Sequence, residues 1–144
     1  ACTAPCREET LRSLIIDDRD DGGCKTDKFE RDIKLLKEGM SNEPENERYM
    51  FYMAQSYLCL KRYEDAIEWY NKRIEKGGWF EEVWYSKYMI GQCYDAMGDW
   101  NNALKYYLEA YQFNPERSET LYEISKHYRL NEQYNLAYFF AQQG

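Results

Sequence analysis

Few residues of this 144-residue chain have the types and spacing that chemistry requires. Asp18 and Asp20 form an Asp-x-Asp spacing, which can hold a divalent metal ion against a nucleotide diphosphate. No glycine-rich phosphate cradle accompanies it, so we interpret this stretch as a solvated acidic loop. His127, the only histidine, lies within a helical pattern, where we interpret it as a packed side chain rather than a general base. The sequence therefore predicts no catalytic residue, no metal site and no cofactor, and we do not expect this chain alone to be an enzyme.

The five cysteines do not form a metal-binding pattern either. None belongs to a Cys-x-x-Cys pair, and Cys2, Cys6 and Cys24 supply three ligands without a nearby fourth, whereas structural zinc takes four. A disulfide between two of these three cysteines is an alternative if the compartment is oxidising. Cys59 and Cys93 fall inside helical patterns, where cysteine behaves as a small apolar residue.

The composition favours a single helical domain. Aromatic residues make up 17% of the chain, while only 8 glycines and 3 prolines are available to interrupt helices. The net charge of −7 disfavours a partner bound through its phosphate backbone, so we expect no nucleic acid. Because the sequence has no apolar run of membrane-spanning length and no secretory signal, we predict no membrane span and a cytoplasmic location, unless the chain is a processed piece.

Residues of three kinds recur along the chain at intervals of 37 and then 34 residues. They are a tyrosine, an alanine, and a small residue three positions before the tyrosine: Tyr57, Tyr94 and Tyr128; Ala66, Ala103 and Ala137; Ala54, Gly91 and Ser125. Small residues at these positions allow two helices of a hairpin to approach closely, and the aromatic residues fill the space around that contact.

This pattern resembles the tetratricopeptide-repeat family. The resemblance implies an all-α fold in which antiparallel helical hairpins stack as an α-solenoid of about seven helices. We expect an irregular N-terminal linker or tail over residues 1–27 and a repeat domain over 28–144. Within that domain we predict a half repeat at 28–44 and repeats at about 45–78, 79–115 and 116–144.

In tetratricopeptide arrays the first helix of each hairpin lines a concave groove. The resemblance therefore implies a groove formed by aromatic, amide and, in the last repeat, basic side chains: Phe51, Tyr52 and Gln55; Tyr85, Tyr88 and Gln92; Tyr122, Lys126 and Arg129. Members that clamp a peptide carboxylate use lysine where this chain has Phe51, Tyr88 and Tyr122. We thus predict a groove for a protein or peptide partner, with a glycan as the alternative, rather than a carboxylate clamp.

Several stretches are also similar to the helical-repeat region that follows the catalytic domain in some family 2 glycosyltransferases. They are residues 21–25, 28–33, 48–57, 77–79, 82–85, 122–123 and 127–129. In that group a Lys-x-x-Arg element, here Lys28 and Arg31, marks the passage from the catalytic domain into the repeats. The resemblance implies an accessory region of a glycosyltransferase, with the catalytic domain as a partner. The alternative is a fragment of an active enzyme whose catalytic domain precedes Ala1.

The end of the chain suggests a third function. Repeat arrays normally end in a unit with a polar outer face, but the last expected helix carries Tyr138, Phe139 and Phe140. We predict that these residues form an assembly face that stacks on the helix at 28–40 of a second copy. In that case the chain is a self-assembling structural repeat protein and a homo-oligomer.

Overall fold

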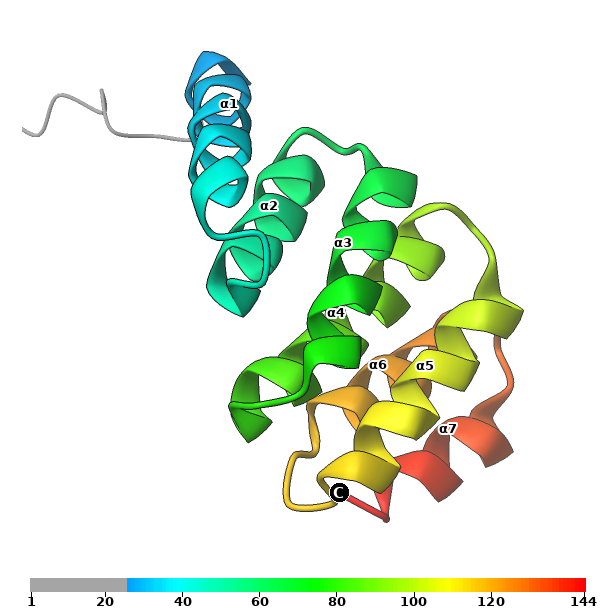
Figure 1. The fold of residues 1–144 in the computed structure, drawn as a ribbon. Coiled ribbons are helices and arrows are strands. Elements are labelled where there is room, and N and C mark those ends of the chain that lie inside the picture. The colour runs from blue at the N-terminus through cyan, green and yellow to red at the C-terminus, as the bar shows by residue number, and fades with distance from the viewer. Residues whose placement is uncertain (1–25) are drawn as a thin grey trace, which may run out of the picture.

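The computed structural model describes residues 26–144, and this part of the chain folds into α-helices without strands (Figure 1). In chain order the helices are α1 (Thr26–Asn42), α2 (Glu47–Cys59), α3 (Tyr63–Lys76), α4 (Phe80–Ala96), α5 (Trp100–Phe113), α6 (Glu119–Leu130) and α7 (Tyr134–Ala141). The predicted all-α class and the seven helices are confirmed. The Asp-x-Asp spacing at residues 18 and 20 and the thiols of Cys2, Cys6 and Cys24 lie outside the described residues, as does nearly all of the predicted linker.

The helices form three antiparallel hairpins, α2/α3, α4/α5 and α6/α7, each stacked on the next (Figure 1). Each helix packs chiefly against its neighbours in the chain, which gives the α-solenoid that the repeat pattern predicts. The helix α1 stands at one end of the array and packs mainly against α2. It therefore has a helix on one side only, whereas α3 and α5 each lie between two.

The turn inside each hairpin has the same geometry. Lys61, Gly98 and Glu132 occupy the middle of these three-residue turns and have positive φ angles of 58°, 79° and 60°. The next backbone N–H in each turn donates to the carbonyl of the repeating tyrosine at 2.9 Å, which closes the end of the first helix. Glycine suits this left-handed conformation best, and only Gly98 meets that preference.

Small residues allow the two helices of each hairpin to approach closely. Ala54 and Gly91 are buried on the first helices, and a Cβ atom at Gly91 would lie 2.6 Å from two ring carbons of Tyr107. In the last hairpin the Ser125 hydroxyl donates to the carbonyl of Ala137 at 2.9 Å, so the small polar residue also links the pair. The packing matches the physical reason given for these small residues.

A buried ion pair joins the second hairpin to the first. Arg73 on α3 is 0% exposed, and its Nε donates to Oε2 of Glu82 on α4 at 2.7 Å. The Arg73 Nη2 lies at 2.7 Å from the same oxygen but outside hydrogen-bond geometry, and Nη1 donates to the carbonyl of Gly77. The charge of Arg73 is thus neutralised inside the array, where an unpaired charge would be costly. The sequence pattern did not predict this pair.

Candidate binding groove

A groove of about 560 Å³ lies along the first helices of the first two hairpins. Its walls come from α2 and α4, and its rim comes from residues at or just before the starts of α4 and α6. The lining residues are Arg48, Phe51, Tyr52, Gln55, Trp79, Glu81, Glu82, Trp84, Tyr85, Tyr88, Arg117 and Glu119. This is the side of the array on which the tetratricopeptide resemblance places the groove.

Aromatic rings form a continuous row along the groove. Phe51 on α2 lies with its ring centroid 5.9 Å from that of Tyr85 on α4, and Tyr85 lies 6.2 Å from Tyr88. Tyr88 stacks on Trp84 at 5.6 Å with the two rings nearly parallel. The row is held by the packing of two helices, so these rings form a surface that is already ordered for a ligand.

Trp84 contributes a hydrogen-bond donor that has no partner. Its side chain is 3% exposed and lines the groove, but Nε1 makes no hydrogen bond within the described part of the chain. The guanidinium of Arg117 lies 4.9 Å from the ring centroid and covers it by a cation–π contact. A buried indole N–H normally has an acceptor, and none of residues 26–144 supplies one here.

The charged residues of the groove differ in how they are paired. Arg117 donates to Glu81 at 2.6 Å and to Glu119 at 3.0 Å, and these hydrogen bonds, that to Glu81 above all, raise the pKa of Arg117. Arg48 instead donates to the hydroxyl of Tyr52 at 3.3 Å and has no ion pair among residues 26–144. Arg48 is therefore a cation that can receive an acidic group from a ligand. Partial burial raises the pKa of Tyr88 to about 12, so this hydroxyl stays protonated and can donate.

The structure places five of the predicted groove residues together in this groove: Phe51, Tyr52, Gln55, Tyr85 and Tyr88. The other four are not among its lining residues. Gln92 donates to the Tyr88 hydroxyl at 3.2 Å and so supports the row of rings from behind. Tyr122 is 63% exposed, Lys126 pairs with Glu123 at 3.0 Å, and Arg129 is exposed on the same helix, α6.

Sequence reasoning missed several lining residues: Arg48, Trp79, Glu81, Glu82, Trp84 and Arg117. Two signals in the sequence could have found some of them. Arg48 and Trp84 lie one helical turn before Tyr52 and Tyr88, so they share the predicted face. Trp79 and Arg117 lie in the connections that lead into α4 and α6. These connections border the groove, because they come directly before the first helices of the hairpins.

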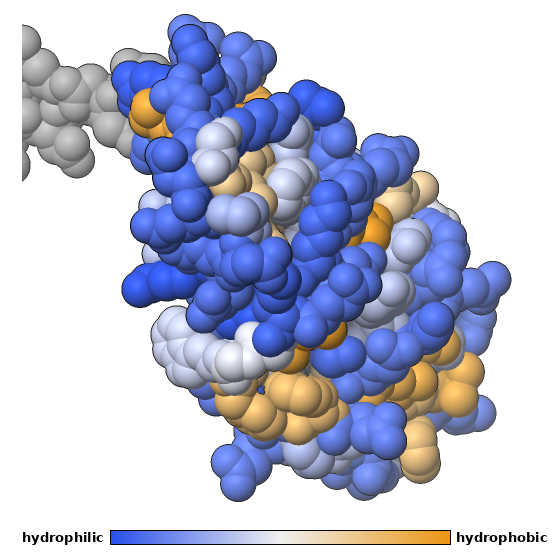
Figure 2. Space-filling view, in the orientation of Figure 1, coloured by the Kyte–Doolittle hydropathy of each residue, from blue (hydrophilic) through white to orange (hydrophobic). Residues whose placement is uncertain are grey.

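The predicted assembly face is divided between the surface and the core. On α7, Tyr138 is 66% exposed and Phe139 is 54% exposed. Phe140 instead is half-buried and stacks on Tyr128 at 5.7 Å, because its position on the helix points toward α6. Phe140 therefore serves the packing of the last hairpin more than an exposed face. Apolar side chains gather on the C-terminal half of the face seen in Figure 2.

His127 packs against aromatic rings in the last two hairpins. Its ring stacks on Trp100 with centroids 3.3 Å apart, and Asp95 Oδ1 lies 4.0 Å from Nδ1. Burial lowers the pKa of His127, opposed by the nearby Asp95. The residues that the structure describes contain no group of three acidic, cysteine or histidine side chains able to hold a metal ion. Among the described helices, none combines the length and the apolar character that crossing a membrane requires.

Comparison with known proteins agrees with the repeat pattern. The tetratricopeptide repeat model matches residues 84–117, which include most of α4 and all of α5. Among curated proteins, none matches the chain by sequence at a significant level.

Several solved structures of MamA have a similar fold. A double mutant of MamA RS-1 superposes with a TM-score of 0.67 at 12% identity over 81% of this chain and 64% of that one. MamA MSR-1 gives 0.64 at 18% identity over 82% and 66%, and MamA AMB-1 gives 0.62 at 16% identity over 79% and 65%. The chain thus spans slightly less than two thirds of each of these proteins. The chain is similar to a tetratricopeptide repeat over residues 84–117 and has the fold of a helical-repeat α-solenoid.

Proposed function

We propose that the chain is a binding module that takes an extended segment of a partner protein in the groove between α2 and α4. The observation that carries this proposal is the ordered row of aromatic rings that lines the groove. Rings held by rigid helices bind apolar side chains with little further ordering cost. The tetratricopeptide repeat within residues 84–117 supports a protein-interaction role.

The charges of the groove indicate which segment fits best. Arg117 is already held by two glutamates, whereas within residues 26–144 Arg48 has the Tyr52 hydroxyl alone as a hydrogen-bond partner. We infer a segment in which a large apolar side chain packs on Tyr85 while a neighbouring acidic side chain pairs with Arg48. A glycan could stack on the same rings, but a neutral sugar has no group for the unpaired cation. The peptide is therefore the better match.

The test begins with peptides selected from a random library on the native chain. Their affinities are then measured by fluorescence anisotropy for three variants, Tyr85→Ala, Arg48→Gln and Tyr134→Ala. Tyr85 is 36% exposed and Tyr134 is 63% exposed, so both tyrosine variants should fold, but Tyr134 lies on α7 outside the groove. Loss of a central aromatic contact costs about 2 kcal/mol, or roughly 30-fold in affinity.

We expect Tyr85→Ala to weaken binding by that factor and Tyr134→Ala to leave it unchanged. Arg48→Gln should weaken only those peptides that carry an acidic residue, and raised salt should weaken the same peptides on the native chain. Equal binding by the native chain and Tyr85→Ala would contradict the groove assignment. If no peptide binds while an uncharged oligosaccharide on a glycan array does, the glycan replaces the peptide as the ligand class.

A link to a family 2 glycosyltransferase depends on the sequence resemblance alone. We propose it as the cellular setting of the module, with the catalytic domain of such an enzyme as its neighbour. The alternative, that the chain belongs to the active enzyme itself, requires an α/β nucleotide-sugar domain encoded before Ala1. Reading the gene upstream of this residue decides between the two. A cytoplasmic location also stays a prediction.

Self-association is a second candidate, favoured by the surface of α7. This helix has no charged residue, and Tyr134, Leu136, Tyr138 and Phe139 are each more than 40% exposed. Burying such a surface against a second copy would be favourable. Sedimentation velocity should then show a mass that rises with concentration and returns to that of the monomer in Tyr138→Asp. A monomer at all concentrations would contradict this candidate.

A further inference from the structure

The outward side of α7 differs from that of the other second helices. The second, third and sixth residues of each second helix share one side of that helix and are exposed or half-buried in all three hairpins. In α3 they are Glu64, Asp65 and Glu68, in α5 they are Asn101, Asn102 and Lys105, and in α7 they are Asn135, Leu136 and Phe139. We call this last set the outer face of α7. Its Leu136 is 42% exposed and its Phe139 is 54% exposed, where the other two hairpins have charged or polar side chains.

The stacking of hairpins does not account for the apolar outer face. The apolar Tyr138 beside it follows the repeat, because Ile67 and Leu104 at the equivalent positions belong to or pack against the two core clusters. The outer face breaks the repeat. Glu68 and Lys105, which are equivalent to its phenylalanine, each keep a 62% exposed side chain although a further hairpin follows both of them. This side of a second helix therefore stays open inside the array, and its apolar side chains in α7 fit a contact outside the array.

We propose that the outer face of α7 pairs with the outer face of a second copy in a dimer with two-fold symmetry. A two-fold axis brings a residue at the centre of the contact close to the same residue of the second copy. Phe139 then packs on Phe139 and Leu136 of the second copy, and the uncharged Asn135 lies at the rim. The proposal rests on the self-association proposed above and is independent of the peptide groove.

The distribution of charge favours a second copy as the occupant. The chain has a net charge of −7, so two copies repel one another over most of their surfaces. Of the seven described helices, α7 alone has no aspartate, glutamate, lysine or arginine. The same pairing through α3 would place Glu68 opposite its own copy, and like charges in contact are unfavourable. The outer face of α7 can therefore meet itself without this cost.

The size of the outer face indicates a weak dimer. The helix α7 has eight residues, which correspond to a length of about 12 Å. Two helices of this length bury much less than the roughly 1,600 Å² of a standard interface, and small interfaces are typical of transient association. We therefore expect a monomer–dimer equilibrium that responds to protein concentration.

Two charge variants of Phe139 test the pairing in the full chain. Phe139→Lys and Phe139→Glu each place like charges across the two-fold axis, so each variant alone should dimerise at least about tenfold more weakly than the native chain. An equimolar mixture of the two should dimerise again, because a lysine then faces a glutamate. Sedimentation velocity between about 10 μM and about 1 mM measures the association. Leu35→Glu is the matched control and should associate as the native chain does, because Leu35 is 56% exposed on α1 at the opposite end of the array (Figure 1).

The mixture separates pairing from a loss of folding. Both variants lose the same ring contact with Phe140, whose centroid lies 5.3 Å from that of Phe139, so recovery on mixing cannot come from restored folding. A mixture that stays monomeric overturns the two-fold pairing, because in a head-to-tail contact Phe139 does not meet its own copy. If each variant alone associates as the native chain does, the outer face is overturned while self-association stands through another surface. If the native chain is a monomer at every concentration, self-association itself fails and this inference fails with it.

Discussion

Replacing Gly91 by alanine should destabilise the protein, although alanine is the better helix former. The added Cβ would lie 2.6 Å from two carbons of the Tyr107 ring, closer than non-bonded carbon atoms approach. Tyr107 is 0% exposed and its ring is enclosed by Tyr88 and Trp100, so it cannot swing into solvent. Either the ring or the backbone of α4 must move.

The expected size follows from two opposing effects. Overpacking a well-packed core costs about 1–3 kcal/mol. Replacing glycine by alanine inside a helix stabilises the helix by about 1 kcal/mol. We therefore expect Gly91→Ala to lower the free energy of unfolding by up to about 2 kcal/mol, measured by urea denaturation with circular dichroism at 222 nm.

Repeating the substitution in a Tyr107→Leu variant isolates the steric effect of the ring. In Tyr107→Leu the ring atoms that meet the new Cβ are absent, so Gly91→Ala should become neutral or stabilising by up to about 1 kcal/mol relative to that background. If Gly91→Ala stabilises the native chain instead, the close approach of α4 to Tyr107 is wrong. Equal losses in both backgrounds would likewise refute the steric explanation.

Three further predictions concern single positions. Lys61→Gly removes a side chain from a left-handed turn and should raise the free energy of unfolding by about 0.5–1 kcal/mol in the same urea assay. Glu82→Gln leaves the charge of the buried Arg73 without its partner and should cost about 3 kcal/mol; a loss under 1 kcal/mol would show that the pair is hydrated. Burial lowers the pKa of His127, so the unfolded chain binds the proton at a higher pH than the folded chain does. The free energy of unfolding should therefore fall as the pH drops below about 6.5, and it should level off below the lowered pKa. His127→Gln should flatten this dependence between pH 7.5 and 5.

The hairpins could be predicted from the sequence because local rules determine them. The tyrosine at each first-helix end, the alanine of each second helix and the small residue before them recur at fixed spacing, and each has a packing role in the structure. The turns were predictable for the same reason, even at Lys61 and Glu132, where no glycine supports the left-handed conformation. Because the whole unit repeats, the turn can be predicted even where one of its residues does not favour the left-handed conformation.

The groove was only half predictable, because its extent depends on how successive hairpins are rotated. Helical spacing selected one face each of α2 and α4, and Phe51 and Tyr88 from those faces line one groove. The same spacing applied to α6 selected Tyr122 and Lys126, which do not line it. Five residues connect α5 to α6, whereas three connect α3 to α4. The sequence gives the length of each connection but not the rotation that it allows between hairpins.

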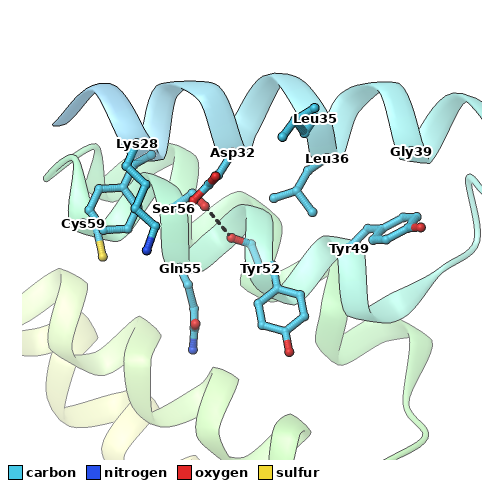
Figure 3. A pocket seen from close by; sticks show the side chains of 11 residues that line it. Lys28, Asp32, Leu35, Leu36, Gly39, Tyr49, Tyr52, Gln55, Ser56 and Cys59 are labelled. Atoms are coloured by element: carbon cyan, nitrogen blue, oxygen red, sulfur yellow. Dashed lines mark hydrogen bonds between the residues drawn. The ribbon is translucent and has the colours of Figure 1, made fainter. Parts of the chain in front are cut away.

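Tyr52 and Gln55 line both the binding groove and a second hollow of about 520 Å³ between α1 and α2 (Figure 3), so the two hollows adjoin along α2 and a substitution at either residue alters both.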